Sequence, residues 1–175
     1  MSAQLPDFVN SLVVDGTRVG WYPERIAAWM RGEHIAPVHA DVAWTRKCQY
    51  ACHFCYAQLQ SNTDGSEVIT REHALNFLSD AQEIGVKGIS IISDGESSIV
   101  PYYAESIEYG SKIGLAMGAG SNGFVLKRPT LERILPHLRF LRFNFSGGER
   151  QRYSSIMGVP QSFYDVVLQN VRDGM

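Results

Sequence analysis

The 175-residue sequence predicts an α/β fold in which four short strands form a parallel sheet and helices connect them. Two observations support this prediction. Short apolar runs alternate with segments whose apolar residues recur at helical spacing. A polar or glycine-rich segment follows each apolar run, and α/β proteins keep their working residues at these carboxyl ends of strands. The connections between such strands are right-handed crossovers.

The first 36 residues are predicted to form an N-terminal extension, and residues 37–175 the α/β domain. Within the extension, Asp15-Gly16 indicates a short hairpin over residues 12–21. Residues 23–31 are predicted to form a helix, because Pro23 suits its first turn and Gly32 suits the position just past its end.

The predicted strands are short, as is usual for strands of a parallel sheet. They cover residues 38–44, 88–93, 115–120 and 139–145. The second is rich in isoleucine, which favours a buried strand. The third contains Gly118 and Gly120, and glycine weakens a strand.

The helices that connect these strands are predicted from apolar spacing and from residues at their ends. They cover residues 70–84, 100–112, 129–137 and 163–172, and the charged run Glu149-Arg150-Gln151-Arg152 marks the start of another. Thr70 is a suitable N-cap and Gly85 a suitable stop for the first of them. Pro129 suits the start of a helix, where a missing N–H costs nothing.

Composition argues against several classes of protein. The net charge of -2 gives no electrostatic case for binding nucleic acid or an anionic membrane surface. The apolar runs are too short to span a bilayer, and the first residues lack the pattern of a signal peptide. Clustered thiols without an export signal favour a reducing compartment, so we expect a cytoplasmic protein.

All three cysteines lie on one short polar segment: Cys48, Cys52 and Cys55. A metal centre on this segment would have three thiolate ligands and one open coordination position. Zinc is one candidate, with His53 as a fourth ligand, but the side chains of adjacent residues such as Cys52 and His53 converge poorly on one ion. An iron–sulfur cluster suits closely spaced thiolates better, because each sulfur binds a different iron. Packing alone explains three thiols in a polar loop poorly.

The spacing of these cysteines, with Phe54 before the last and Tyr56 after it, resembles the motif of radical S-adenosylmethionine enzymes. The resemblance implies a partial (β/α) barrel, of which this chain supplies about four βα units. It also implies a 4Fe–4S cluster on the three cysteines and S-adenosylmethionine on the open iron. Reductive cleavage of this cofactor would yield a 5′-deoxyadenosyl radical that abstracts a substrate hydrogen. The reductant would be of the flavodoxin or ferredoxin type.

Three later segments resemble further motifs of this family. Asp94-Gly95-Glu96-Ser97 is similar to its Gly-Gly-Glu-Pro motif, and Ser121-Asn122-Gly123 is similar to its Thr-Asn-Gly turn. Residues 144–148 are similar to its Ser-x-Asp-Gly segment, with Asn144 and Ser146 as departures. The resemblance implies contacts to S-adenosylmethionine from Phe54 and Tyr56 at the adenine, Gly95 and Glu96 at the amino group, and Ser121, Asn144 and Ser146 at the ribose and carboxylate. It names no residue that acts on the substrate.

The final predicted helix resembles that of members with a C-terminal auxiliary-cluster domain, the SPASM group. The family barrel has six βα units, so the resemblance implies that this chain is an N-terminal fragment. Two alternatives stay open: a non-catalytic zinc or iron–sulfur module, and an inactive truncated fragment. Peptides, sugars and nucleosides are all possible substrates. His34, His39, His73 and His137 have no convergent spacing and are predicted to be surface or packed residues.

Overall fold

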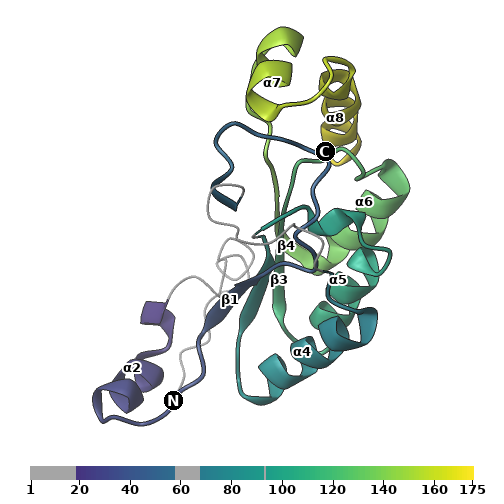
Figure 1. Ribbon diagram of the computed structural model, residues 1–175. Helices are drawn as coiled ribbons and strands as arrows, with labels where there is room; N and C mark the ends of the chain where they lie inside the picture. Colours follow the sequence, from purple (N-terminus) through teal and green to yellow (C-terminus); the bar gives the residue numbers. More distant parts are fainter. Residues whose placement is uncertain (1–18, 58–67, 93) are drawn as a thin grey trace.

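The computed structural model describes residues 19–57, 68–92 and 94–175, and it confirms the predicted parallel sheet (Figure 1). The strands are β1 (His39–Val42), β2 (Gly88–Ile91), β3 (Ala116–Ser121) and β4 (Leu138–Phe143). They lie in the order β1-β2-β3-β4, each parallel to the next, as successive right-handed βα units require. Their carboxyl ends therefore share one edge of the sheet.

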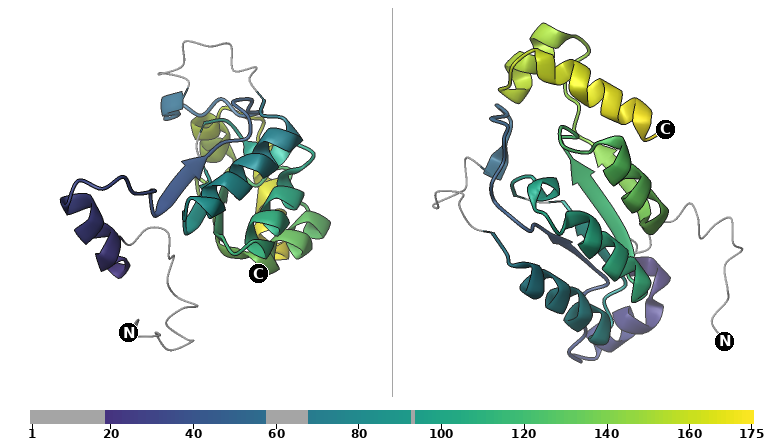
Figure 2. Two further views of the ribbon diagram at one scale, coloured as in Figure 1. Left: turned by 90° about the horizontal axis from the view of Figure 1, so that it is seen from below. Right: turned by 90° about the vertical axis from the view of Figure 1, so that its right-hand side faces the viewer.

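Three helices cover one face of this sheet (Figure 1, Figure 2). They are α4 (Arg71–Glu83), α5 (Tyr103–Lys112) and α6 (Arg128–Ile134), with the short 3-10 helices η3 (Ser97–Ile99) and η4 (Leu135–His137) beside them. The predicted cap at Thr70 is confirmed, because its hydroxyl accepts a hydrogen bond from the His73 backbone N–H at 3.2 Å. Gly85 ends the same helix with a φ of 95°.

The main hydrophobic core lies between the sheet and these three helices. Every second residue of the strands points into it, including Ile89, Ile91, Met117 and Ala119, which are all fully buried. On the helix side, Leu78 of α4 and Ile107 of α5 are also fully buried, as are Leu131 and Ile134 of α6. This arrangement is the one that the alternation of apolar strands and helices predicts.

The two glycines of β3, which weaken the prediction of a strand there, are required by packing on the opposite face. A Cβ at Gly118 would lie 2.2 Å from the Phe140 ring, and a Cβ at Gly120 would lie 2.5 Å from the Ile92 side chain. Neighbouring strands therefore place large side chains over β3. Any larger residue would displace them.

A second, smaller hydrophobic cluster lies beyond the carboxyl ends of the strands, around α7 (Arg150–Met157) and α8 (Ser162–Asp173) (Figure 1). Its buried members are Tyr50, Tyr153, Met157, Val159 and Val167. Tyr50 comes from the cysteine segment, so two parts of the chain about a hundred residues apart meet here. The last predicted helix is confirmed, and α7 begins at the predicted charged run.

The described part of the extension contains η2 (Val19–Trp21) and α2 (Pro23–Met30), and α2 has no buried residue. Arg25 ties it to the domain through the carbonyl oxygens of Ala36 (2.9 Å), Pro37 (3.1 Å) and Gly85. Most of the predicted hairpin, residues 12–18, lies outside the described residues. The division of the chain at residue 36 stays a prediction.

Candidate functional site

The cysteine loop, residues 43–57, begins where β1 ends and meets the segments that follow β2 and β3. The Glu96 backbone N–H donates to the Lys47 carbonyl at 2.9 Å. The Gln49 side-chain amide donates to Asn122 Oδ1 at 3.2 Å. The structure thus brings together three of the predicted motifs at the carboxyl edge of the sheet, where ligands of open α/β sheets bind.

Glu96 is the centre of a buried hydrogen-bond network. Its side chain is only 4% exposed. Oε1 accepts from the Ser98 hydroxyl (2.5 Å), the Ser98 backbone N–H (3.3 Å) and the Ser121 hydroxyl (2.8 Å), and Oε2 accepts from the Asn122 backbone N–H (2.7 Å). Such bonds offset the cost of burying a carboxylate. Oε2 keeps capacity to accept another donor, since a carboxylate has about four lone-pair positions.

The neighbouring Gly95 brings this network against the cysteine loop. It has a φ of 72°, and a Cβ there would lie 2.3 Å from the Thr45 carbonyl oxygen and 2.7 Å from the Arg46 carbonyl carbon. Only glycine fits both the backbone conformation and the space. We expected the Gly95 backbone to lie close to a cofactor. In the structure it lies close to the backbone of the cysteine loop. Its approach to a cofactor stays a prediction.

Asp94, which departs from the glycine of the family motif, also contacts the loop. Its carboxylate lies 3.5 Å from the Arg46 guanidinium, and both side chains are about one-third exposed. This ion pair and the contact at Gly95 attach the turn after β2 to the start of the cysteine loop. Asp94, which replaces the glycine of the family motif, thus helps to hold the cysteine loop against this turn.

The three thiols lie at the exposed side of this network. Cys48 is exposed, whereas Cys52 and Cys55 are half-buried. The Cys48 sulfur accepts from the Tyr50 backbone N–H at 3.4 Å and lies 4.0 Å from the Asn122 amide nitrogen. The Cys52 sulfur lies 3.9 Å from the Met157 sulfur. Cys48 therefore faces the Glu96 network, and Cys52 faces the second cluster.

Burial and mutual repulsion oppose ionisation of these thiols. Although Cys48 is exposed as a residue, partial desolvation of its thiol raises its pKa, and the negative charges of Glu96 and Cys55 add to this effect. The pKa of Cys52 is raised to about 11, mainly by burial and then by the charges of Cys48 and Cys55. Three adjacent thiolates need a positively charged centre to offset their repulsion. An iron–sulfur cluster fits this donor set, because it binds each thiolate through a different iron.

The alternative of a single zinc ion stays a prediction. Across residues 19–57, 68–92 and 94–175, no three His, Cys, Asp or Glu side chains form a group that could hold one metal ion, and this includes the three cysteines as they are placed here. His53, the suggested fourth ligand, is exposed next to Cys52. A structural zinc site needs four side chains that converge on one point.

The other predicted contact residues lie at the same edge but outside the Glu96 network. Phe54 and Tyr56 are 56% and 55% exposed, so their rings are accessible. Asn144 is exposed and its backbone N–H donates to the Ser121 carbonyl at 2.8 Å, while Ser146 is half-buried. Within the described chain, neither Asn144 nor Ser146 makes a side-chain hydrogen bond. Their roles stay predictions.

The sequence does not identify the residues of the second hydrophobic cluster that hold the cysteine loop in place. The Tyr50 and Tyr153 hydroxyls lie 3.0 Å apart in the second cluster, and the His53 backbone N–H donates to the Ile156 carbonyl at 3.0 Å. Gly158 has a φ of 63°, and a Cβ there would lie 2.2 Å from the Ala51 carbonyl oxygen. We call Tyr50, Tyr153 and Gly158 the loop clamp. No pattern in the sequence pairs Tyr50 with Tyr153 or Gly158 with Ala51.

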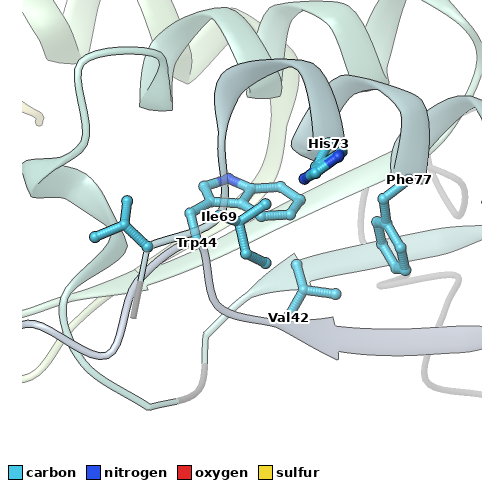
Figure 3. A pocket seen from close by; sticks show the side chains of 6 residues that line it. Val42, Trp44, Ile69, His73 and Phe77 are labelled. Carbon is cyan, nitrogen blue, oxygen red and sulfur yellow. The ribbon is translucent and has the colours of Figure 1, made fainter. Parts of the chain in front are cut away.

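A cavity of about 410 Å³ lies away from the cysteines, at the edge formed by β1 and α4 (Figure 3). It is lined by Val42, Trp44, Val68, Ile69, His73 and Phe77. The lining is apolar except for His73, so the cavity lacks the polar groups of the site described above. None of the described helices is long and apolar enough to cross a membrane.

Comparison with curated sequences finds a similar protein that is AdoMet-dependent by name. The chain is 28% identical over 125 residues to the AdoMet-dependent heme synthase of Methanosarcina barkeri. The match covers 70% of this chain and 35% of that protein, so the chain spans about a third of the length of this relative. No family profile matches the chain.

Comparison with solved structures gives the fold. Streptococcus suis SuiB bound to S-adenosylmethionine has a TM-score of 0.66 at 14% identity, over 89% of this chain and 36% of that one. Methylornithine synthase has a TM-score of 0.55 at 16% identity, over 96% and 51%. BtrN in complex with AdoMet and 2-DOIA has a TM-score of 0.51 at 14% identity, over 73% and 54%.

These comparisons agree with the motif and with the strand order. The fold matches part of the barrels of those enzymes. The name of the sequence relative states that it is AdoMet-dependent. The cysteine loop stands after the first strand of the series, as the resemblance implies. The chain is therefore similar in fold to part of SuiB, methylornithine synthase and BtrN, and similar in sequence to part of an AdoMet-dependent heme synthase.

Proposed function

We propose that Cys48, Cys52 and Cys55 bind a 4Fe–4S cluster and that the carboxyl edge of the sheet binds S-adenosylmethionine. When bound, this pair supplies the reductive cleavage that yields a 5′-deoxyadenosyl radical, which abstracts a hydrogen atom from the substrate. The observation that carries the proposal is the position of the Glu96 network. A buried carboxylate with spare acceptor capacity lies directly against a loop of three thiols.

The residues of the site have distinct parts in this proposal. Glu96 accepts a hydrogen bond from the ammonium of S-adenosylmethionine through Oε2, and such a charge-assisted bond is strong in a buried site. Ser121 and the Asn122 backbone hold that carboxylate in place. The exposed rings of Phe54 and Tyr56 flank the adenine. Asn144 and Ser146 serve the ribose and carboxylate.

Iron content of the anaerobically reconstituted chain tests the cluster. We expect about four irons per chain, a brown chromophore, and loss of both in Cys52→Ala. His53→Ala is the matched variant in the same loop, because only the zinc alternative needs that side chain. It should keep the full iron content. One zinc per chain, lost in His53→Ala, would contradict the proposal.

The substrate and the reductant stay predictions, since the chain spans about a third of the length of this curated relative. The matched structures include SuiB bound to its precursor peptide, a methylornithine synthase and BtrN with 2-DOIA, which differ in chemistry. A flavodoxin- or ferredoxin-type reductant and a cytoplasmic location stay predictions. So does a SPASM-type auxiliary domain.

A further inference from the structure

The thiols of the cysteine loop lie in different surroundings. The Cys52 sulfur lies beside the Met157 sulfur of the second cluster. The Cys48 sulfur lies beside two N–H groups, the Tyr50 backbone N–H at 3.4 Å and the Asn122 side-chain amide, whose nitrogen is 4.0 Å away. The backbone donor belongs to the loop itself and is present whichever residue follows. The amide donor depends on one side chain that lies 74 residues further along the chain.

Two neighbours fix the orientation of the Asn122 amide. Its Oδ1 accepts from the Phe124 backbone N–H at 3.0 Å and from the Gln49 side-chain amide at 3.2 Å. The Phe124 N–H can only donate, so the atom that faces it must be the oxygen. The amide nitrogen is therefore the atom that points to Cys48. A flipped amide would set two donors against each other.

The turn that carries Asn122 is held from two sides. The Asn122 backbone N–H donates to Glu96 Oε2 at 2.7 Å. On the other side, the Asn170 amide of α8 donates to the carbonyl oxygens of Gly123 (2.7 Å) and Phe124 (3.1 Å). Asn122 and Asn170 are both buried. The donor that faces Cys48 is thus in place beforehand, and such a donor needs little reorganisation when charge develops beside it.

A donor at this position favours negative charge on the Cys48 sulfur. Burial is the largest cause of the raised pKa of this thiol, whereas the Tyr50 N–H and the Asn122 amide act in the opposite direction. Reduction of an iron–sulfur cluster adds one negative charge, which spreads over its irons and sulfurs. Hydrogen bonds to the sulfurs stabilise that charge, so they raise the reduction potential of the cluster.

We propose that Asn122 is a positioning residue that raises the reduction potential of the cluster through the Cys48 thiolate. This inference rests on the proposed function, because it needs a cluster on the three cysteines. The backbone N–H of the same residue holds Glu96, the carboxylate assigned above to the ammonium of S-adenosylmethionine. A substitution at Asn122 changes the side chain and keeps that backbone N–H. The potential of the cluster and the binding of the cofactor can therefore be separated.

Redox titration of the reconstituted chain, followed by electron paramagnetic resonance without S-adenosylmethionine, tests this inference. Asn122→Ser keeps an oxygen that can accept from the Phe124 N–H but lacks the amide donor. At a fixed solution potential we expect its ratio of reduced to oxidised cluster to fall about threefold to tenfold, or about 30–60 mV for one electron. Asn122→Asp keeps the size of the side chain but turns a carboxylate oxygen toward Cys48, so its ratio should fall further.

Two matched variants separate the donor from the general order of the turn. Asn170→Ser removes the amide that holds the Gly123 and Phe124 carbonyls and leaves Asn122 unchanged. Gln49→Ala removes one partner of Asn122 Oδ1 and leaves the amide donor. Both should keep the potential of the unsubstituted chain. An equal shift in Asn170→Ser and Asn122→Ser would overturn the inference, because the order of the turn would then explain it.

Iron content and the response to S-adenosylmethionine, measured on the same samples, separate the two proposals. Absence of a 4Fe–4S signal in the unsubstituted chain would overturn the proposed function. A full cluster whose potential is the same in the unsubstituted chain, Asn122→Ser and Asn122→Asp would overturn this inference alone. S-adenosylmethionine should still change the signal of Asn122→Ser, since Glu96 keeps its backbone partner. Loss of that response together with the shift would also overturn the inference, because the Asn122 side chain would then order the Glu96 network.

Discussion

The two hydrophobic clusters of this protein differ in the distance along the chain that their contacts span. The main core joins consecutive βα units, so each strand packs against helices that are near it in sequence. The second cluster joins Tyr50 to Tyr153 and Val167 and supports the cysteine loop. We infer from this difference that the sheet with its helices and the cysteine loop can be destabilised separately. A change in the main core should unfold the domain, whereas a change in the second cluster should loosen the cysteines within an intact frame.

Truncation in the main core should have the largest effect. Ile107 is fully buried in α5, and Ile107→Ala should lower the free energy of unfolding by about 2–5 kcal/mol, because it leaves a cavity. Urea denaturation followed by circular dichroism measures this. Ile84→Ala is the control, since Ile84 is 63% exposed and its loss should cost little. Equal effects of both variants would contradict the assignment of the core.

Gly158→Ala should have the next largest effect, and it should fall on the site. The new Cβ meets the Ala51 carbonyl at 2.2 Å, so the cysteine loop must shift. We expect reduced iron content after reconstitution with an unchanged helical spectrum. Backbone strain at positive φ adds about 1–2 kcal/mol.

Gly114 supplies the matched control for that strain. It has a φ of 93°, and a Cβ there would meet nothing within 4 Å. Gly114→Ala should therefore lose similar stability but keep its iron. If both variants lose iron equally, the loop contact at Gly158 does not matter for the site.

Tyr153→Phe should have the smallest effect of the three. It removes one hydroxyl of the 3.0 Å pair and leaves Tyr50 without its partner, which costs about 1–3 kcal/mol for a buried group. We expect faster loss of iron to a chelator. Tyr109→Phe removes a similar bond to Ser79 (2.7 Å) beside the main core and should leave iron loss unchanged. The same rate in both variants would argue against a clamp.

The same comparison explains what could be predicted from the sequence. The strands, the cap at Thr70 and the cysteine loop depend on residues close together in the chain, and all were predicted. Tyr50 could not be matched to Tyr153, because nothing in a single sequence pairs positions that far apart. Gly95 was predicted at the right place for a contact with the cofactor, while the structure shows its contact with Thr45 and Arg46.

The glycines of β3 show a related limit. Judged alone, Gly118 and Gly120 weaken a strand. Only the register of β4 and the position of Ile92 reveal that large neighbouring side chains need that space. The resemblance names Glu96 and Ser121 as separate contacts of S-adenosylmethionine, whereas the hydrogen bonds that Ser121 and Ser98 donate to Glu96 are seen only in the structure. Propensity and motif locate such residues, and packing decides what they touch.

We propose above all that S-adenosylmethionine binds an open iron of a cluster held by the cysteine loop. Electron paramagnetic resonance of the reduced, reconstituted chain tests this most directly, before and after S-adenosylmethionine is added. We expect a 4Fe–4S signal that changes when S-adenosylmethionine is added, and a weaker response at equal cofactor concentration in Glu96→Gln. An intact cluster signal that S-adenosylmethionine leaves unchanged would contradict it.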